Sequence, residues 1–206
     1  MMTIHNFARG GRGLRVMWLC EEMGLPYAVH NHTFPVSADY RVLNPLGTVP
    51  ALEDDGGVVM NESVAIMLYI AQRHGPTPLL PTEDPVRLAR CLQLTLFGET
   101  ELGMMLNPLI AARFMAAEAD KRNWSVVGLE ERVARAIDYA ETLIRGRSCL
   151  VGDDLTLADI SVSCGLAIWQ GALGGKLPDA LSTWQDRMRA RPAYERARAR
   201  CTSGAA

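Results

Sequence analysis

Two short stretches of this chain combine residue types that can hold a ligand. They cover residues 44–52 and 61–66. Pro50 cannot donate a hydrogen bond to a strand ladder, so the first stretch predicts a turn that leads into a strand. Glu62 and Ser63 begin an apolar helical pattern, and the free amides at the start of a helix attract anions. Together the two stretches predict a site for an extended, peptide-like ligand that carries a carboxylate.

The chemistry of this site depends on main-chain groups and on two side chains. If the peptide bond between Val49 and Pro50 is cis, the Val49 amide turns outward, where the main chain of a ligand can pair with it. Ser63 offers a hydroxyl and an amide to a carboxylate, and Glu62 offers an acceptor to an ammonium. Each charge-assisted hydrogen bond of this kind contributes about 1.5–3 kcal/mol. The alternative is an ordinary loop before a strand, followed by residues that only favour a helix start.

Residues 1 to about 80 must position these two stretches, and they alternate strand and helix patterns. Strand patterns cover residues 3–7, 27–33, 50–53 and 58–60, and the last two strands form a hairpin across residues 54–57. Apolar stripes at helical spacing predict one helix around residues 16–23 and a second helix that Asn61 caps. The predicted order is strand, helix, strand, then strand, strand, helix.

The proline-rich residues 75–81 predict a domain boundary, because strand patterns stop there. Helical patterns follow at residues 84–117, 125–145, 156–170, 178–190 and 192–200. Thr156 and Asp159 predict a capping box before an apolar run, which is a structural feature and not a site. The arginines between Arg187 and Arg200 predict a solvated helix face. We therefore assign residues 1–75 to the first domain, 76–84 to a linker and 85–206 to an all-helical domain.

The composition limits the class of protein. Hydrophobic residues make up 49% of the 206 residues and charged residues 21%, which favours a folded globule. The net charge of −2 gives no electrostatic reason to expect nucleic acid or a membrane as a partner. The chain has no apolar run of about 20 residues and no signal-peptide pattern. Its five widely spaced cysteines predict free thiols in a reducing compartment, without disulfides or a zinc site, and the cytoplasm is the expected location.

The chain resembles the glutathione S-transferase family. The resemblance rests on residues 14–27, 44–52, 61–66, 155–160 and 184–192, which occur in the family's order and cover nearly the whole chain. It implies an α/β thioredoxin-like N-terminal domain followed by an all-α C-terminal helical domain. It also implies glutathione as a co-substrate, a small apolar electrophile as its partner in the reaction, no metal and a cytoplasmic homodimer with a role in detoxification.

The resemblance also implies roles for particular residues. In the family the proline equivalent to Pro50 is cis, and the residue before it pairs with the cysteinyl part of glutathione. Thr48 and Val49 would therefore bind glutathione with Pro50. The acid–serine pair, here Glu62 and Ser63, holds the γ-glutamyl end. The electrophile would lie against the long helix, where Met105, Pro108 and Arg113 are the candidates because soft, adaptable side chains suit a broad apolar pocket.

The loop after the first strand departs from the family pattern. Family members aim a tyrosine, serine or cysteine at the glutathione sulfur, whereas residues 8–13 contain neither a hydroxyl nor a thiol. Lowering a thiol pKa of about 8.5 by two units requires about 2.7 kcal/mol of thiolate stabilisation. Arg9 or Arg12, together with the amides of Gly11 and Arg12 at a helix start, can supply it electrostatically, and these three residues are the catalytic candidates. His5 and Asn6 are expected to face the core or the sheet.

Other interpretations of this loop remain open. In one, the chain has lost catalysis and kept glutathione binding; in the other, the glycines of the loop form a plain flexible turn beside exposed arginines. The corresponding alternative functions are a glutathione-binding protein without transferase activity and a glutathione-dependent reductase or isomerase on the same fold. The affinity for glutathione and the pKa of the bound thiol distinguish them.

Overall fold

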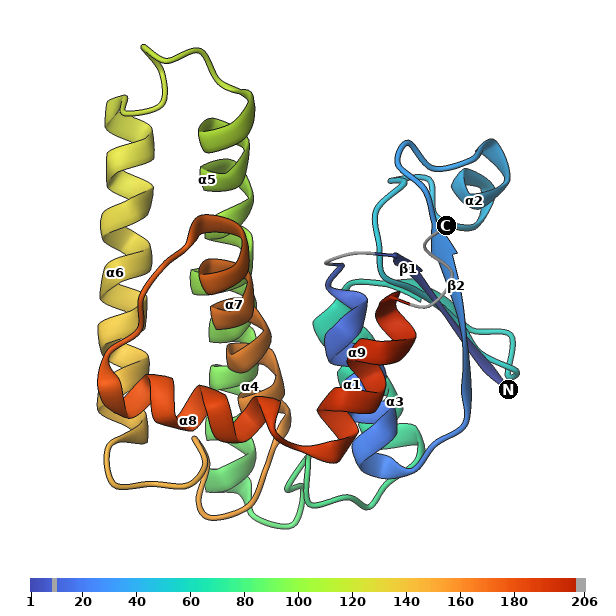
Figure 1. Cartoon of the computed structure of the whole chain (residues 1–206). Helices are drawn as coiled ribbons and strands as arrows, with labels where there is room; N and C mark the ends of the chain where they lie inside the picture. The colour runs from blue at the N-terminus through green and yellow to red at the C-terminus, as the bar shows by residue number, and fades with distance from the viewer. Residues whose placement is uncertain (9–10, 203–206) are drawn as a thin grey trace. The chain divides into compact units, whose positions relative to one another are not determined.

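The structure, a computed structural model, describes residues 1–8 and 11–202, which divide into two compact units (Figure 1). The first unit contains residues 1–80 and the chain from Arg189 onward, and the second contains Pro81–Met188. The sequence analysis assigned the C-terminal helix to the helical domain, whereas here that helix groups with the first unit. Among the described residues, no helix is long and apolar enough to cross a membrane.

The first unit is a mixed sheet with helices. Its strands lie in the order β2-β1-β3-β4, with β1 and β2 parallel and the other two pairs antiparallel. The thioredoxin-like prediction is confirmed. The elements are β1 (Met2–Phe7), α1 (Gly13–Met23), β2 (Tyr27–His32), α2 (Ala38–Leu43), β3 (Ala51–Glu53), β4 (Val59–Asn61), α3 (Ser63–Arg73) and α9 (Pro192–Thr202).

The core of this unit lies between the sheet and its helices. Ile4 and Leu52 on neighbouring strands, Trp18 on α1 and Ile66 on α3 are fully buried. Burying a large apolar side chain contributes about 1.5–3 kcal/mol, so these four residues fix α1 and α3 against the sheet. The starts of both helices are thereby held in place, and these starts carry the predicted site.

Ion pairs attach α9 to α1. Arg191 donates to both carboxylate oxygens of Glu22 at 2.6 and 2.9 Å, and Arg196 donates to Glu21 at 2.6 Å. Arg200 also lies 3.4 Å from Glu21. Arg196 and Arg200 are exposed, as the prediction of a solvated face expected, but they also pair with a carboxylate of α1, and Arg191 is half-buried. Figure 1 shows α9 running beside α1.

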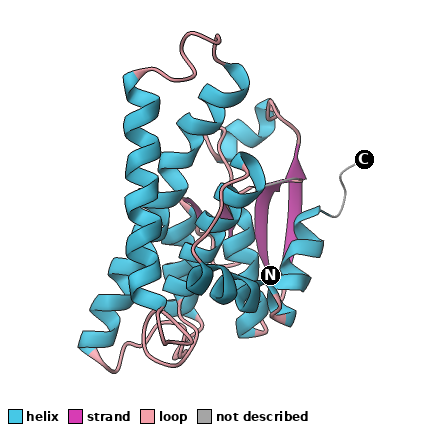
Figure 2. Ribbon diagram, turned by 60° about the vertical axis from the view of Figure 1, so that its left-hand side comes forward, coloured by secondary structure: helices cyan, strands magenta, loops and turns pink. Residues whose placement is uncertain are grey.

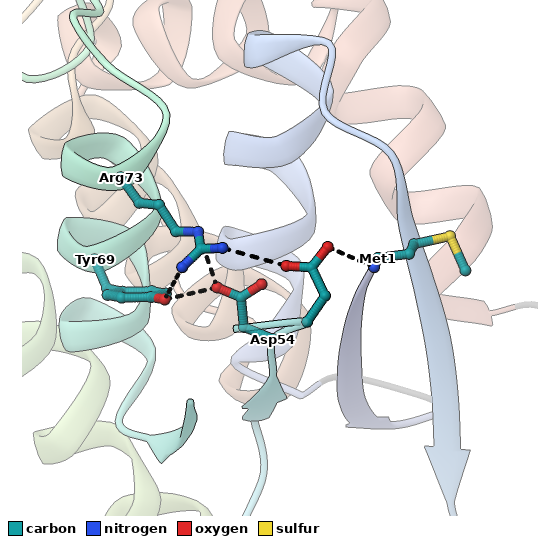
Figure 3. Close-up of polar contacts among 5 residues, drawn as sticks. Met1, Asp54, Tyr69 and Arg73 are labelled. Atoms are coloured by element: carbon teal, nitrogen blue, oxygen red, sulfur yellow. Dashed lines mark hydrogen bonds and ion pairs between the residues drawn. The ribbon is translucent and has the colours of Figure 1, made fainter. Parts of the chain in front are cut away.

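A polar network ties α3 to the β3–β4 hairpin (Figure 3). The buried Asp54 accepts a hydrogen bond from Tyr69 at 2.6 Å and lies 3.2 Å from Arg73 Nε. Arg73 also donates to Tyr69 at 3.1 Å and to Asp55 at 3.2 Å, and Asp55 accepts from the N-terminal ammonium of Met1 at 2.8 Å. Since Tyr69 and Arg73 lie one turn apart on α3, the network sets the direction of this helix relative to the hairpin that precedes it.

The second unit is helical in the described residues, and Figure 2 shows its long helices. A π-helical segment interrupts the long helix predicted over residues 84–117. Gly98 and Gly165 allow this segment to approach α7 (Leu157–Leu173) closely, because a Cβ at either position would lie within 3.0 Å of the facing chain. The elements are α4 (Pro85–Phe97), η1 (Gly98–Gly103), α5 (Met104–Met115), α6 (Trp124–Ile144), α7 (Leu157–Leu173) and α8 (Asp179–Arg189).

The predicted capping box at the start of α7 is confirmed. Asp159 is fully buried and accepts hydrogen bonds from the Thr156 amide at 2.9 Å and the Thr156 hydroxyl at 2.9 Å. A third hydrogen bond comes from the Leu150 amide at 2.8 Å. Burial raises the pKa of Asp159, while these donors act in the opposite direction. The carboxylate thus joins the loop before α7 to the helix itself.

Candidate functional site

The segment that leads into β3 has the main-chain form expected of it. The peptide bond between Val49 and Pro50 is cis, which confirms the expectation from the family resemblance. The carbonyl of Thr48 accepts hydrogen bonds from the Tyr40 hydroxyl at 2.6 Å and from the Asn44 amide at 2.8 Å. By contrast, no hydrogen bond joins Val49 to another of the described residues. The Thr48 carbonyl is therefore held by two hydrogen bonds, whereas the main chain of Val49 is available to pair with a ligand.

Asn44 connects the two candidate stretches. This residue is 2% exposed, donates to Thr48 and accepts from Asn61 Nδ2 at 3.1 Å and from the Leu46 amide at 3.3 Å. Asn61 was expected to cap the following helix, but this prediction was wrong. Its side chain points to Asn44, and the residue at the N-cap is Glu62. The sequence analysis included Asn44 only as part of a turn. Its partner Asn61 lies 17 positions further along the chain, so the hydrogen bond between them leaves no local pattern in the sequence.

Replacing Asn44 with alanine is expected to lower the free energy of unfolding by about 1–3 kcal/mol, because the amide of a buried network is removed. Affinity for glutathione is expected to fall as well, since Thr48 and Asn61 lose their common partner. Urea unfolding and calorimetric titration measure the two effects. Asn107→Ala, at an exposed position on α5, is the matched control. An Asn44→Ala protein with unchanged stability and affinity would refute the positioning role.

The start of α3 presents an exposed acid beside a buried hydroxyl. Glu62 is exposed and has φ 69° and ψ 104°, a backbone conformation that residues other than glycine rarely adopt. Its carboxylate has no hydrogen bond or ion pair with any described residue. Ser63 is 3% exposed, and its hydroxyl accepts a hydrogen bond from Arg15 at 3.1 Å.

Arg15 is a functional candidate that the sequence analysis missed. It lies on α1, is fully buried and reaches the first residue of α3. A guanidinium beside a helix N-terminus increases the positive potential there, because the helix dipole has the same sign at that end. An anion bound at Ser63 would be attracted both by the Arg15 guanidinium and by the dipole of α3. An arginine on an apolar helix stripe was the available signal, but its partner 48 residues away could not be read from the sequence.

The loop before α1 is shaped by Asn6. A Cβ at Gly13 would lie 2.5 Å from Asn6 Oδ1, and a Cβ at Gly11 would overlap the same atom. Asn6 is fully buried and His5 is 6% exposed, so both face the interior as expected. Arg12 is half-buried and occupies the N-cap of α1 without a side-chain cap. Arg9 lies outside the described residues.

No cysteine is placed for chemistry. All five cysteines are free and buried, and burial is the main reason why the pKa of Cys20 is raised to about 12. Cys91 also has a raised pKa, again chiefly because of burial. Thiolate is the reactive form of cysteine, so such residues are inert. Cys20 therefore packs in the core, as expected.

We expect the native protein to react with Ellman's reagent much more slowly than free glutathione does, because every thiol is buried. In denaturant all five thiols should react rapidly. Absorbance of the released product measures both phases. A native thiol that reacts as fast as free glutathione would contradict the structure and would favour thiol–disulfide chemistry.

The electrophile candidates all lie on α5. Met105 is half-buried, while Pro108 and Arg113 are exposed. Arg113 lines a cavity of about 180 Å³ within the second unit and donates to the carbonyl of Leu173 at 3.2 Å. The residues that line this cavity include Leu109, Val126 and Trp169 but neither Met105 nor Pro108. Of the three residues predicted to bind the electrophile, Arg113 alone lines this cavity.

Comparison with known families matches both parts of the chain. Residues 13–73 match the model described as glutathione S-transferase, N-terminal domain, and residues 105–192 match that of the C-terminal domain. Glutathione S-transferase stcT of Emericella nidulans is 31% identical over 203 residues, which cover 92% of this chain and 88% of the relative. The chain belongs to the glutathione S-transferase family. Glutathione S-transferase 4 of Zea mays is 30% identical over 198 residues, which cover 87% of this chain and 83% of the relative.

Solved structures share the fold. Ure2p in complex with S-p-nitrobenzylglutathione aligns with a TM-score of 0.86 at 21% identity and covers 96% of this chain and 94% of its own. The glutathione transferase URE2P5 from Phanerochaete chrysosporium aligns with a TM-score of 0.82 at 24% identity, over 95% and 92% of the two chains. The arrangement of β3, β4 and α3 is therefore that of the family fold.

Proposed function

We propose that this member of the glutathione S-transferase family is a transferase that binds glutathione in its first unit and joins the glutathione sulfur to a small apolar electrophile. The tripeptide lies with its cysteinyl main chain beside Thr48, Val49 and Pro50. Its γ-glutamyl end lies at the start of α3. Relatives named glutathione S-transferases and solved structures that contain glutathione conjugates support this assignment.

The observation that carries the proposal is the conformation of Glu62. Holding a residue other than glycine at φ 69° costs about 1–3 kcal/mol, and such outliers cluster at ligand sites. The carboxylate is exposed and has no hydrogen bond or ion pair with the described residues, so it can accept hydrogen bonds from the γ-glutamyl ammonium. The neighbouring Ser63 hydroxyl and amide, with the charge of Arg15 close to the hydroxyl, donate hydrogen bonds to the γ-glutamyl carboxylate.

Thiol activation is assigned to the start of α1. The amides of Gly11 and Arg12 and the guanidinium of Arg12 or Arg9 stabilise the thiolate, which then attacks the electrophile. As the carbon–sulfur bond forms, the leaving group departs with the bonding electron pair, and the proton lost from the thiol passes to solvent. No metal is needed for this reaction. The electrophile binds along α5 through Met105, Pro108 and Arg113, and the protein acts as a cytoplasmic homodimer in detoxification.

One relative supports a second candidate reaction. Probable maleylacetoacetate isomerase 2 of Drosophila melanogaster is 31% identical over 121 residues, which cover 59% of this chain and 51% of the relative. Isomerisation also begins with attack of the glutathione thiolate, but the sulfur then leaves again and no conjugate accumulates. The two reactions share the binding site and differ in their products.

The experiment measures the pKa of bound glutathione by the ultraviolet absorbance of its thiolate, and conjugation with 1-chloro-2,4-dinitrobenzene by initial rates. We expect a thiol pKa of about 6.5 in place of about 8.5, and Arg12→Ala should return it toward the free value. Arg198→Ala, at an exposed position on α9, is the control. Tight binding with an unchanged thiol pKa and no conjugate would contradict the transferase and favour a binding protein. No binding at all would contradict both.

A further inference from the structure

Three of the four histidines of the chain gather on one face of the sheet. In the parallel pair β1–β2, His5 lies opposite His30, and Phe7 lies opposite His32. Because side chains alternate along a strand, His30 and His32 point to the same face as their neighbour His5. The rings of His30 and His32 are stacked at 4.4 Å, and the centroid of the His5 ring lies 5.1 Å from that of His32.

Each of these imidazoles has one nitrogen close to a nitrogen of the other two. The three ligand atoms lie within 4.8 Å of one another, and His5 Nδ1 is 2.9 Å from His32 Nε2. Nitrogens that share a tetrahedral Zn²⁺ at about 2.0–2.1 Å are about 3.3 Å apart. Because an imidazole binds a metal in its own ring plane and these rings are stacked, His30 and His32 would rotate about their side-chain bonds to aim all three lone pairs at one ion.

A carboxylate orients the most buried of the three rings. Glu53 Oε1 on β3 lies 2.7 Å from His5 Nε2. When the neutral ring donates this N–H, Nδ1 keeps its lone pair and faces the other two histidines. Histidine ligands of metals commonly donate their second N–H to a carboxylate in this way. Since His5 is held by the sheet and by Glu53, it is already positioned as a ligand before any metal arrives.

The cluster is also accessible from solvent. His5 is buried, His32 is half-buried and His30 is exposed, so an ion can reach the nitrogens from the side of His30. The Tyr40 ring lies 4.0 Å from His32 and covers one side of the cluster. Its hydroxyl already donates to the carbonyl of Thr48, so it is not counted as a ligand.

We infer that His5, His30 and His32 form a binding site for a divalent transition metal of borderline softness, of which Zn²⁺ is the representative. Three neutral imidazoles suit Zn²⁺, Cu²⁺ and Ni²⁺ and exclude Mg²⁺ and Ca²⁺, which require oxygen ligands. Three protein ligands leave a fourth position for water or another small ligand. The sequence analysis expected no metal, because the cysteine spacing showed no zinc site and the family resemblance implied none. This inference does not depend on the proposed transferase reaction.

The test uses the untagged full chain, freed of metal by a chelator and titrated with Zn²⁺ in a calorimeter without glutathione. One Zn²⁺ per chain is expected to bind. His30→Gln, at the exposed ligand, should weaken binding at least about 100-fold, and Glu53→Gln should weaken it about 10–100-fold. His74→Gln, which changes the exposed fourth histidine outside the cluster, should bind Zn²⁺ like the unchanged protein. Circular dichroism of each variant confirms that it is folded.

Titration with Co²⁺ gives an independent readout, because a tetrahedral cobalt site has intense visible absorption and a thiolate ligand adds a charge-transfer band. The proposal expects the visible bands without the thiolate band, and their loss in His32→Gln. It is overturned if the unchanged protein takes up no stoichiometric Zn²⁺, or if His30→Gln binds as tightly as the unchanged protein. A thiolate band would also overturn it, since the metal would then be held by cysteines.

Discussion

Replacing Asp159 with alanine is expected to lower the free energy of unfolding by about 3–5 kcal/mol. The buried carboxylate accepts three hydrogen bonds, two from Thr156 and one from the Leu150 amide. Its removal leaves those donors buried without an acceptor and detaches the loop from the start of α7. Urea unfolding followed by circular dichroism measures the loss as a lower midpoint.

Two variants separate this effect from a general change in charge. Asp186→Ala alters an exposed carboxylate on α8 and is expected to change stability by less than about 0.5 kcal/mol. Asp159→Asn keeps one acceptor for Leu150 but turns an amide toward the donors of Thr156, so an intermediate loss is expected. If Asp159→Ala unfolds at the same urea concentration as Asp186→Ala, the carboxylate does not hold the second unit together.

Replacing Glu62 with glutamine is expected to weaken glutathione binding and to leave stability nearly unchanged. Glu62→Gln removes the charge that would face the γ-glutamyl ammonium and should weaken glutathione binding by about 10–150-fold, since one charge-assisted bond contributes about 1.5–3 kcal/mol. Stability should hardly change, because the carboxylate has no partner among the described residues. Calorimetric titration gives the affinity, and urea unfolding gives the stability.

Glu62→Gly tests the main-chain strain at the same position. Glycine adopts φ 69° freely, so relief of about 1–3 kcal/mol of strain is offset by about 0.4–1 kcal/mol from the more flexible unfolded chain. This variant should therefore be about 1 kcal/mol more stable and still bind glutathione poorly. Glu83→Gln, at another exposed acid, is the control.

A ligand variant completes the design. Deamino-glutathione lacks the ammonium that Glu62 would bind, so Glu62→Gln should not weaken its binding any further. If the substitution weakens glutathione and its deamino form equally, Glu62 does not contact the ammonium, and the placement of the γ-glutamyl end at α3 fails.

The elements that sequence analysis predicted correctly are those with a local pattern. Strand-like stretches at residues 3–7 and 27–33 located β1 and β2, and residues 54–57 located the turn of the hairpin. Helix α2 was not predicted, because its six residues are too few for an apolar stripe. Its cap is visible only in the structure, where the Ser37 hydroxyl accepts from the Tyr40 amide at 3.2 Å.

Long-range contacts account for most of what the sequence did not predict. The pairing of Arg191 with Glu22 joins residues 169 positions apart, and it moves α9 from the predicted helical domain to the first unit. Arg15 similarly finds Ser63 across 48 positions. Electrostatic pairs of this kind follow from how helices pack, so charge patterns along the chain do not reveal them.

The candidate site was predicted in part by resemblance and in part by chemistry. The residues of the glutathione prediction lie just before or at the start of β3 and at the start of α3, and Val49 makes no hydrogen bond with the described residues. The positive φ of Glu62 and the bridge formed by Asn44 had no signal in the sequence, since both depend on how the hairpin meets α3. The histidine cluster depends on the register between β1 and β2, which periodicity alone does not fix.

A crystal structure of the protein with glutathione tests the central claim most directly. The account predicts that the γ-glutamyl carboxylate lies within hydrogen-bond distance of the Ser63 hydroxyl and amide, with the ammonium at Glu62 and the cysteinyl main chain paired with Val49. Glutathione bound elsewhere, or a site left empty at saturating glutathione, would contradict it.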